Sequence, residues 1–165
     1  MSRALPPAVS LVGPPGNLSA APVHQFFHGT AQRFASILVG GGIRVAAGSG
    51  EFGVGFYTQN RVTDAWHWAI ARWQRGSESA AVVQISVDPA DLKSFTIKGP
   101  LSHKKSDQLR TVVERNGKSA YKAGVDVIVG TIIDRPRKIQ QKFESDATEA
   151  LLNSSRVKRV LNARS

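Results

Sequence analysis

Two short motifs in this chain of 165 residues combine side chains that could bind a planar ligand and its sugar. The first is His28-Gly29-Thr30, and the second is the glycine-rich segment 48–58, whose last aromatic residue is Tyr57. An imidazole can hydrogen-bond a ribose hydroxyl, and a tyrosine ring can stack on a planar heterocycle. Gly29 lets the backbone approach a ligand closely, because glycine has no Cβ. Each motif alone fits a turn histidine or a packed tyrosine, whereas the pair favours a binding site.

Other chemistries require spacings that this sequence does not have. The glycine-rich segment lacks the G-x-x-x-x-G-K-[ST] order, and an expected strand rather than a helix follows it, which disfavours a P-loop or Rossmann site. The absence of cysteine excludes disulfides, thiolate metal sites and a cysteine nucleophile. No G-x-S-x-G nucleophile elbow occurs. The sequence predicts no zinc site, because its four histidines are too scattered: His24, His28, His67 and His103. We therefore expect no bound metal.

The first motif is expected to lie at the end of a short strand over 24–28, directly before a helix. Thr30 could cap that helix through its hydroxyl, and the glycines at 40–42 are expected to end it. The buried face of the helix is predicted from apolar residues at positions i, i+3 and i+4, namely Phe34, Ile37 and Leu38.

The remaining elements alternate irregularly between strands and helices. Further strands are expected over 43–45, 80–87, 94–97, 126–133 and, as a basic edge strand, 156–161. Helices are expected from Thr63-Asp64 to Gly76, from a cap at Ser106 to Gly117, and over 137–152. Because no regular βαβ rhythm appears, the pattern predicts an α+β fold.

The composition suggests one folded domain with a short N-terminal arm. Residues 1–22 hold five of the eight prolines and are expected to be an extended or disordered arm, so the single domain would span 23–165. No apolar run approaches the ~20 residues of a transmembrane helix. The formal net charge is +10, and residues 93–165 carry nearly all of the excess, which suggests contact with a polyanionic partner.

Taken together, the motifs resemble the ADP-ribosyltransferase superfamily, in its branch related to diphtheria toxin and poly(ADP-ribose) polymerase. In that branch an H-G-T or H-G-S ends the first strand and holds the nicotinamide ribose and amide. A G-x-G-x-[YF] strand then supplies a tyrosine that stacks on nicotinamide. The matching residues here are 28–30 and 53–57, and the similarity to bacterial toxin-type members extends over about 26–160. The resemblance implies a split β-sandwich with flanking helices and NAD as the substrate.

The resemblance also implies an acidic residue at the start of a late strand, where the classical branch has a catalytic glutamate. Asp126 opens the expected strand 126–133 and is the first candidate for this role. Glu51 could instead reach the nucleotide cleft, whereas Glu114 and Glu149 fall on expected helices. The expected catalytic residues are His28, Tyr57 and Asp126, and those expected to bind NAD are His28, Gly29, Thr30, Arg44, Phe56 and Tyr57.

The function implied by the resemblance is mono-ADP-ribosylation of a macromolecular acceptor, a protein or a nucleic acid. The charge excess would then serve acceptor docking, for which the cluster 156–159 is the first candidate. Such a chain would be a cytoplasmic or delivered toxin or effector without membrane insertion, partnered by an immunity or antitoxin protein, and we see no convincing signal peptide. Alternatives are an inactive NAD- or partner-binding member of the same fold, a basic nucleic-acid-binding module, and chemistry like that of tRNA 2′-phosphotransferases.

Overall fold

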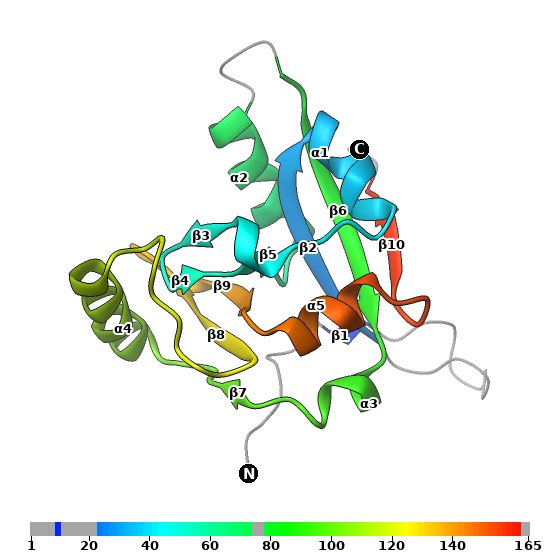
Figure 1. Ribbon diagram of the computed structural model, residues 1–165. Helices are drawn as coiled ribbons and strands as arrows, with labels where there is room; N and C mark the ends of the chain where they lie inside the picture. Colours follow the sequence, from blue (N-terminus) through cyan, green and yellow to red (C-terminus); the bar gives the residue numbers. More distant parts are fainter. Residues whose placement is uncertain (1–8, 11–22, 74–77, 163–165) are drawn as a thin grey trace.

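The computed structural model describes residues 9–10, 23–73 and 78–162, which form a mixed α+β structure as expected (Figure 1). The arm expected over 1–22 therefore lies outside the described residues, except for 9–10, and so does Gly76. The strands are β1 (Val9–Ser10), β2 (Val23–Ala31), β3 (Ser49–Gly50), β4 (Gly53–Val54), β5 (Phe56–Gln59), β6 (Ala80–Val87), β7 (Ile97–Lys98), β8 (Val127–Ile132), β9 (Arg135–Phe143) and β10 (Lys158–Leu161). The helices are α1 (Gln32–Val39), the 3-10 turn η1 (Val45–Ala47), α2 (Val62–Trp73), α3 (Pro89–Leu92), α4 (His103–Asn116) and α5 (Asp146–Asn153).

One mixed sheet organises the described residues, in the strand order β10-β6-β2-β5-β9-β8-β7, with β1 paired to β2. All pairs are antiparallel except β7 with β8, which are parallel. Strands β3 and β4 form a separate hairpin beside the sheet. Strand β10 lies at the edge of the sheet, so the prediction of a basic edge strand is confirmed.

The sheet divides between β2 and β5. Strand β2 pairs with β6 at eight positions, from His24 to Ala31, but its pairing with β5 has one position, Phe27 opposite Gln59. Beyond that position the two strands diverge, and Figure 1 shows β2, β6 and β10 running in a different direction from β5, β8 and β9. Two half-sheets therefore meet at β2 and β5, which leaves space between the two sequence motifs.

Each half-sheet has its own helical cover. Helix α2 packs closely on β2 because Gly29 faces it: a Cβ at Gly29 would lie 2.3 Å from the carbonyl oxygen of Ala65. Helix α4 packs on β8, where the buried Ser106 hydroxyl accepts a hydrogen bond from the Thr131 amide. The largest hydrophobic cluster lies on the other side of the sheet and includes Phe26, Phe143 and Leu152. None of the described helices has the length and apolar character needed to span a membrane.

Several elements differ from the sequence prediction. The helix expected over 137–152 is wrong: strand β9 comes first, and α5 begins only at Asp146. The spacing of Ile139 and Phe143 also fits a helix, but β9 lies between β5 and β8 and is buried on both faces from Gln140 onward, so polar and apolar residues do not alternate along it.

The expected helix caps at Thr30 and Ser106 are also wrong. Thr30 remains inside β2, and α1 begins after Ala31 without a side-chain cap. Helix α4 begins one turn earlier than expected, because Ser102 accepts the capping bond from the Lys105 amide. The segment 43–45 is not a strand, and it leads into η1.

Candidate active site

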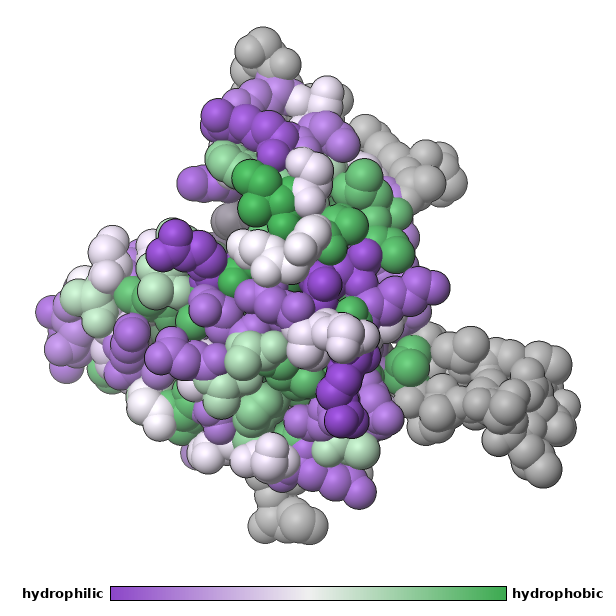
Figure 2. Space-filling view, turned by 45° about the vertical axis from the view of Figure 1, so that its right-hand side comes forward, coloured by the Kyte–Doolittle hydropathy of each residue, from purple (hydrophilic) through white to green (hydrophobic). Residues whose placement is uncertain are grey.

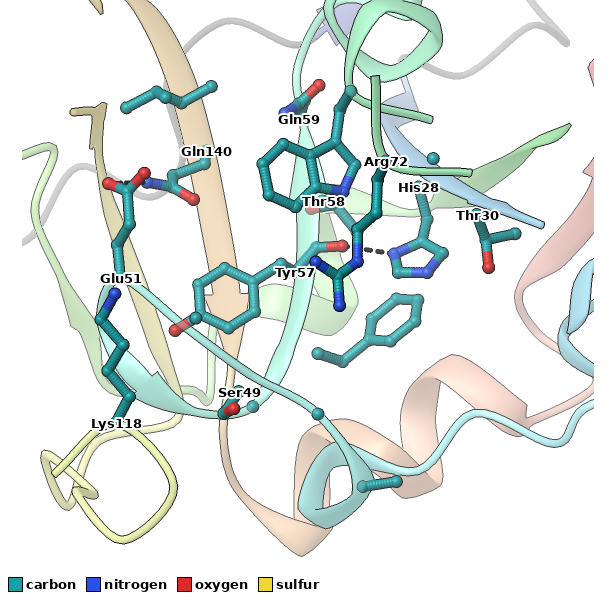
Figure 3. A pocket seen from close by; sticks show the side chains of 18 of the residues that line it. His28, Thr30, Ser49, Glu51, Tyr57, Thr58, Gln59, Arg72, Lys118 and Gln140 are labelled. Atoms are coloured by element: carbon teal, nitrogen blue, oxygen red, sulfur yellow. Dashed lines mark hydrogen bonds between the residues drawn. The ribbon is translucent and has the colours of Figure 1, made fainter. Parts of the chain in front are cut away.

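A large pocket opens where β2 and β5 diverge, and it contains both sequence motifs (Figure 3). Its volume is about 1120 Å³, which is above the ~300–1000 Å³ of typical small-molecule sites. His28 and Thr30 line it from β2, and Phe56 and Tyr57 line it from β5. The structure thus brings together residues that lie almost 30 positions apart in the sequence.

His28 is held in one orientation by two contacts. Its Nδ1 lies 2.5 Å from the carbonyl oxygen of Tyr57, and its ring stacks on Phe56 with the centroids 4.3 Å apart. A carbonyl oxygen can only accept, so Nδ1 carries the proton. Burial lowers the pKa of His28 below its ordinary value, which keeps the imidazole neutral near pH 7. The neutral ring therefore has Nε2 as a hydrogen-bond acceptor.

Tyr57 is anchored by its hydroxyl. The hydroxyl donates to the carbonyl oxygen of Gly53 at 2.6 Å and accepts from the amide of Phe52 at 2.9 Å. Gly50 lies directly against the ring, because a Cβ there would come within 2.8 Å of Cζ. Burial raises the pKa of Tyr57 far above its ordinary value, with a contribution from the charge of Glu51, so the hydroxyl stays protonated. Since the hydroxyl is already bonded, the ring surface is what Tyr57 offers to a ligand.

The glycine-rich segment folds into the hairpin of β3 and β4 rather than into a phosphate-binding loop. Gly53 has φ 91°, and a Cβ there would lie 2.3 Å from the carbonyl oxygen of Tyr121. That same oxygen accepts a hydrogen bond from the Val54 amide, which attaches the hairpin to the segment after α4. Gly53 is therefore required both by its backbone conformation and by this close approach.

Glu51, at the tip of the hairpin, is the best-held carboxylate that lines the pocket. Its Oε1 accepts from Arg110 Nη1 at 2.7 Å, from the Ile133 amide at 3.0 Å and from Gln140 Nε2 at 3.0 Å. Its side chain is 20% exposed, and among the described residues its Oε2 has no hydrogen-bond donor. Arg110 also bonds the carbonyl oxygen of Thr131 and the carboxylate of Asp107. Glu51 is thus fixed with one oxygen left for a ligand.

The other candidate carboxylates are placed differently. Asp126 does not line the pocket, and its Oδ2 accepts from the Thr96 amide at 2.7 Å at the opposite end of β8. Glu149 accepts from the Val45 amide and supports η1 from outside the pocket. Glu114 lines the rim, but its side chain is 66% exposed and pairs with Lys118. The structure therefore does not place Asp126 in the pocket with His28 and Tyr57, whereas Glu51 lines the same pocket as both.

Of the remaining predicted residues, Gly29, Thr30, Arg44 and Phe56 all line the pocket. Gly29 serves α2 packing as well as the pocket wall, and Phe56 belongs mainly to the core, where it is 6% exposed. Trp66 on α2 does not line the pocket, and its Nε1 donates to Asn162.

Sequence reasoning missed Arg110 and Gln140, which hold Glu51. Both are buried polar residues within an expected helix, so neither stood out from ordinary surface positions. The only available signal was the run of polar residues 140–142 between Ile139 and Phe143, which is unusual for a strand that is paired on both sides.

The basic cluster 156–159 lies away from the pocket and has internal roles. Arg159 donates to the carbonyl oxygens of four residues: Val39, Leu152, Ser154 and Val157. Arg156 forms an ion pair with Asp91, with Nη2 and Oδ1 2.6 Å apart. The interpretation of this cluster as a docking site is therefore not supported by its contacts, since Arg159 is occupied within the fold.

No group of three or more histidine, aspartate or glutamate side chains within the described ranges is arranged to hold a metal ion. A comparison with protein-family models finds none that matches the chain, and a comparison with curated proteins finds no significant match. The geometry of the pocket is therefore the basis on which a function can be argued.

Proposed function

We propose that the protein is an NAD-dependent mono-ADP-ribosyltransferase, which cleaves the bond between nicotinamide and ribose and transfers ADP-ribose to a macromolecule. The observation that carries this proposal is the meeting of three groups in one pocket: a neutral imidazole at His28, an anchored ring at Tyr57 and a carboxylate at Glu51. The divergence of β2 from β5 supports a split β-sandwich of the ADP-ribosyltransferase type.

Nicotinamide would stack on the ring of Tyr57, whose hydroxyl bonds keep that ring in place. His28 Nε2 would accept a hydrogen bond from a hydroxyl of the adjacent ribose, since Nδ1 is already bonded to the backbone. Arg44 lines the same pocket without an ion-pair partner among the described residues, and it would contact the pyrophosphate.

The reaction needs a negative charge near the anomeric carbon. As the bond to nicotinamide breaks, the ribose develops oxocarbenium character, which a fixed carboxylate stabilises. Glu51 takes this role here in place of Asp126, because Glu51 lines the pocket and Asp126 does not. Nicotinamide leaves with the bonding electron pair, the acceptor nucleophile bonds to the anomeric carbon, and Glu51 Oε2 accepts the proton that the acceptor loses.

Incubation with NAD labelled in its adenylate phosphate tests the proposal. We expect the wild-type protein to transfer label to macromolecules of a cell lysate, and both His28→Ala and Tyr57→Ala to abolish the transfer. Leu161→Ala is the control, because Leu161 is 48% exposed on β10, away from the pocket. NAD binding without turnover would identify a non-catalytic member of this fold, and neither binding nor turnover would reject the assignment.

A further inference from the structure

Large apolar side chains are exposed on one wall of the pocket. Phe34 and Ile37 on α1 are 36% and 56% exposed, and Trp68 on α2 is 49% exposed. With Trp73 they line the same pocket as His28 and Tyr57, and we call these four residues the aromatic shelf: Phe34, Ile37, Trp68 and Trp73. Figure 2 shows hydrophobic surface exposed in the upper part of the molecule, where Figure 1 places α1 and α2.

The shelf corrects the expectation that Phe34 and Ile37 would be buried. The core-facing side of α1 is instead formed by Ala35, with Leu38 and Val39 packed partly against the core. The i, i+3 and i+4 pattern identified an apolar face correctly, but most of that face is turned toward the pocket. Exposed aromatic side chains beside a pocket mark a place where a ligand or partner binds.

Guanidinium groups lie against two rings of the shelf. Arg33 Cζ is 4.5 Å from the centroid of Phe34, and Arg72 Cζ is 5.4 Å from that of Trp73. The two rings meet edge to face at 5.6 Å, although Phe34 and Trp73 lie on different helices. Each arginine directly precedes its aromatic residue in the sequence, and the fold brings the two pairs together into one cluster of aromatic and basic groups.

One of these cations is available for a phosphate. Arg33 pairs with Glu78 at 2.9 Å, but Arg72 has no ion-pair partner in the described part of the chain. Figure 3 shows the Arg72 side chain pointing toward the space between Tyr57 and His28. A phosphate that Arg72 binds would lie close to both the shelf and the proposed catalytic residues.

We propose that the aromatic shelf binds an unpaired base of a single-stranded polynucleotide, which is the acceptor of ADP-ribose. This inference rests on the proposed function. Exposed aromatic rings with adjacent arginines are the usual means of binding single-stranded nucleic acid, because any base can stack on them. The net charge of +10, most of which lies in residues 93–165, favours the approach of a polyphosphate chain to the protein. The pocket volume of about 1120 Å³ leaves room for a base beside the dinucleotide.

The transfer requires no further reactant. The bond between the anomeric carbon and nicotinamide breaks, and nicotinamide leaves with the electron pair. A nitrogen or oxygen of the shelf-bound nucleotide forms the new bond to that carbon and loses one proton to Glu51, from which it passes to water. The products are nicotinamide, a proton and the ADP-ribosylated polynucleotide.

Binding is tested first, by fluorescence anisotropy with labelled 12-nucleotide single strands of RNA and of DNA and with the matching duplex. We expect the single strands to bind more tightly than the duplex, with an affinity that falls as salt rises. Trp68→Ala should weaken single-strand binding roughly tenfold, and Trp68→Phe should restore most of it. Leu161→Ala removes an equally exposed apolar side chain away from the shelf and should change nothing. The single strand that binds more tightly, RNA or DNA, identifies the kind of polynucleotide that the shelf binds.

Transfer is tested next, with NAD labelled in its adenylate phosphate and the same oligonucleotides. We expect label on the single strand, and we expect Trp68→Ala to lower this transfer by a larger factor than it lowers nicotinamide release from NAD alone. Duplex bound as tightly as single strand, or unchanged binding by Trp68→Ala, would overturn the proposal. If Trp68→Ala raised the KM for NAD by the same factor as it weakens single-strand binding, the shelf would bind the adenine of NAD, which would overturn the proposal. Label found only on proteins, when a lysate is the acceptor, would make the acceptor a protein and would also overturn the proposal. Single-strand binding without any NAD cleavage would instead reject the proposed transferase function while supporting the binding site.

Discussion

Replacing Gly50 by alanine should displace the ring on which nicotinamide is proposed to stack. A Cβ at this position would lie 2.8, 3.0 and 3.1 Å from Cζ, Cε2 and Cε1 of Tyr57. Ordinary contact begins at about 3.4 Å, so the ring must retreat by about 0.6 Å. It cannot retreat freely, because the Tyr57 hydroxyl bonds both Phe52 and Gly53.

The size of the effect follows from that displacement. A misplacement of about 1 Å in an active site can cost about a hundredfold in rate, so we expect kcat/KM for nicotinamide release to fall about ten- to a hundredfold. The extra methyl group should also lower the free energy of unfolding by about 1–3 kcal/mol, as overpacking does. The protein should remain folded, and the loss should appear as a change in rate rather than as loss of protein.

Gly40→Ala is the matched control for this experiment. The same methyl group there would meet only the carbonyl oxygens of Ser36 and Ile37, at 3.4 and 3.5 Å, and the backbone has φ −74°. Nicotinamide release is measured by chromatography, and folding is followed by thermal denaturation. Wild-type turnover by Gly50→Ala, or an equal loss in both variants, would refute the role given to the Tyr57 ring.

Three further predictions concern charged and titratable groups. Because burial lowers the pKa of His28, the unfolded chain binds this proton first, so the free energy of unfolding should decline as the pH falls below about 6.5, the ordinary pKa of histidine. NAD cleavage depends on the folded protein, in which this pKa is lower, so it should decline only at a more acidic pH. His28→Gln should remove this part of the pH dependence of unfolding, and an unchanged profile would contradict it. Glu51→Gln should slow nicotinamide release about 10²–10³-fold with little change in the KM for NAD, because Glu51 lines the pocket. Asp126→Asn should leave turnover unchanged, and the reverse result in the same assay would restore Asp126 to the catalytic role. Arg159→Ala should lower the free energy of unfolding by about 2–4 kcal/mol, because four carbonyl oxygens lose their donor. Lys158→Ala changes an exposed residue and should alter it by less than about 0.5 kcal/mol. Both values are measured by chemical denaturation, and similar values would show that the hydrogen bonds of Arg159 do not stabilise the fold.

Local signals in the sequence were sufficient where one interaction decides the structure. The β-branched run 80–87 becomes strand β6 with the expected bounds, and the glycines at 40–42 end α1. The predictions failed where segments distant in the sequence determine the secondary structure. The apolar residues of β9 have the spacing of a helix, but pairing with β5 and β8 makes this segment a strand.

The candidate site divides in the same way. His28 and Tyr57 could be recognised because each lies in a short motif with its own spacing. The support of Glu51 by Arg110 and Gln140 comes from three segments that no local pattern connects. The aromatic shelf likewise depends on how α1 and α2 lie around the pocket, since the periodicity of α1 cannot show which neighbour its apolar face meets.

The release of nicotinamide from NAD by the purified protein tests the central claim most directly. The wild-type chain should release nicotinamide slowly with water as the acceptor, and His28→Ala and Tyr57→Ala should each reduce the rate at least a hundredfold while the variants remain folded at the assay temperature. A wild-type chain that releases no nicotinamide, or folded variants that release it at the wild-type rate, would contradict the assignment of this pocket to NAD cleavage.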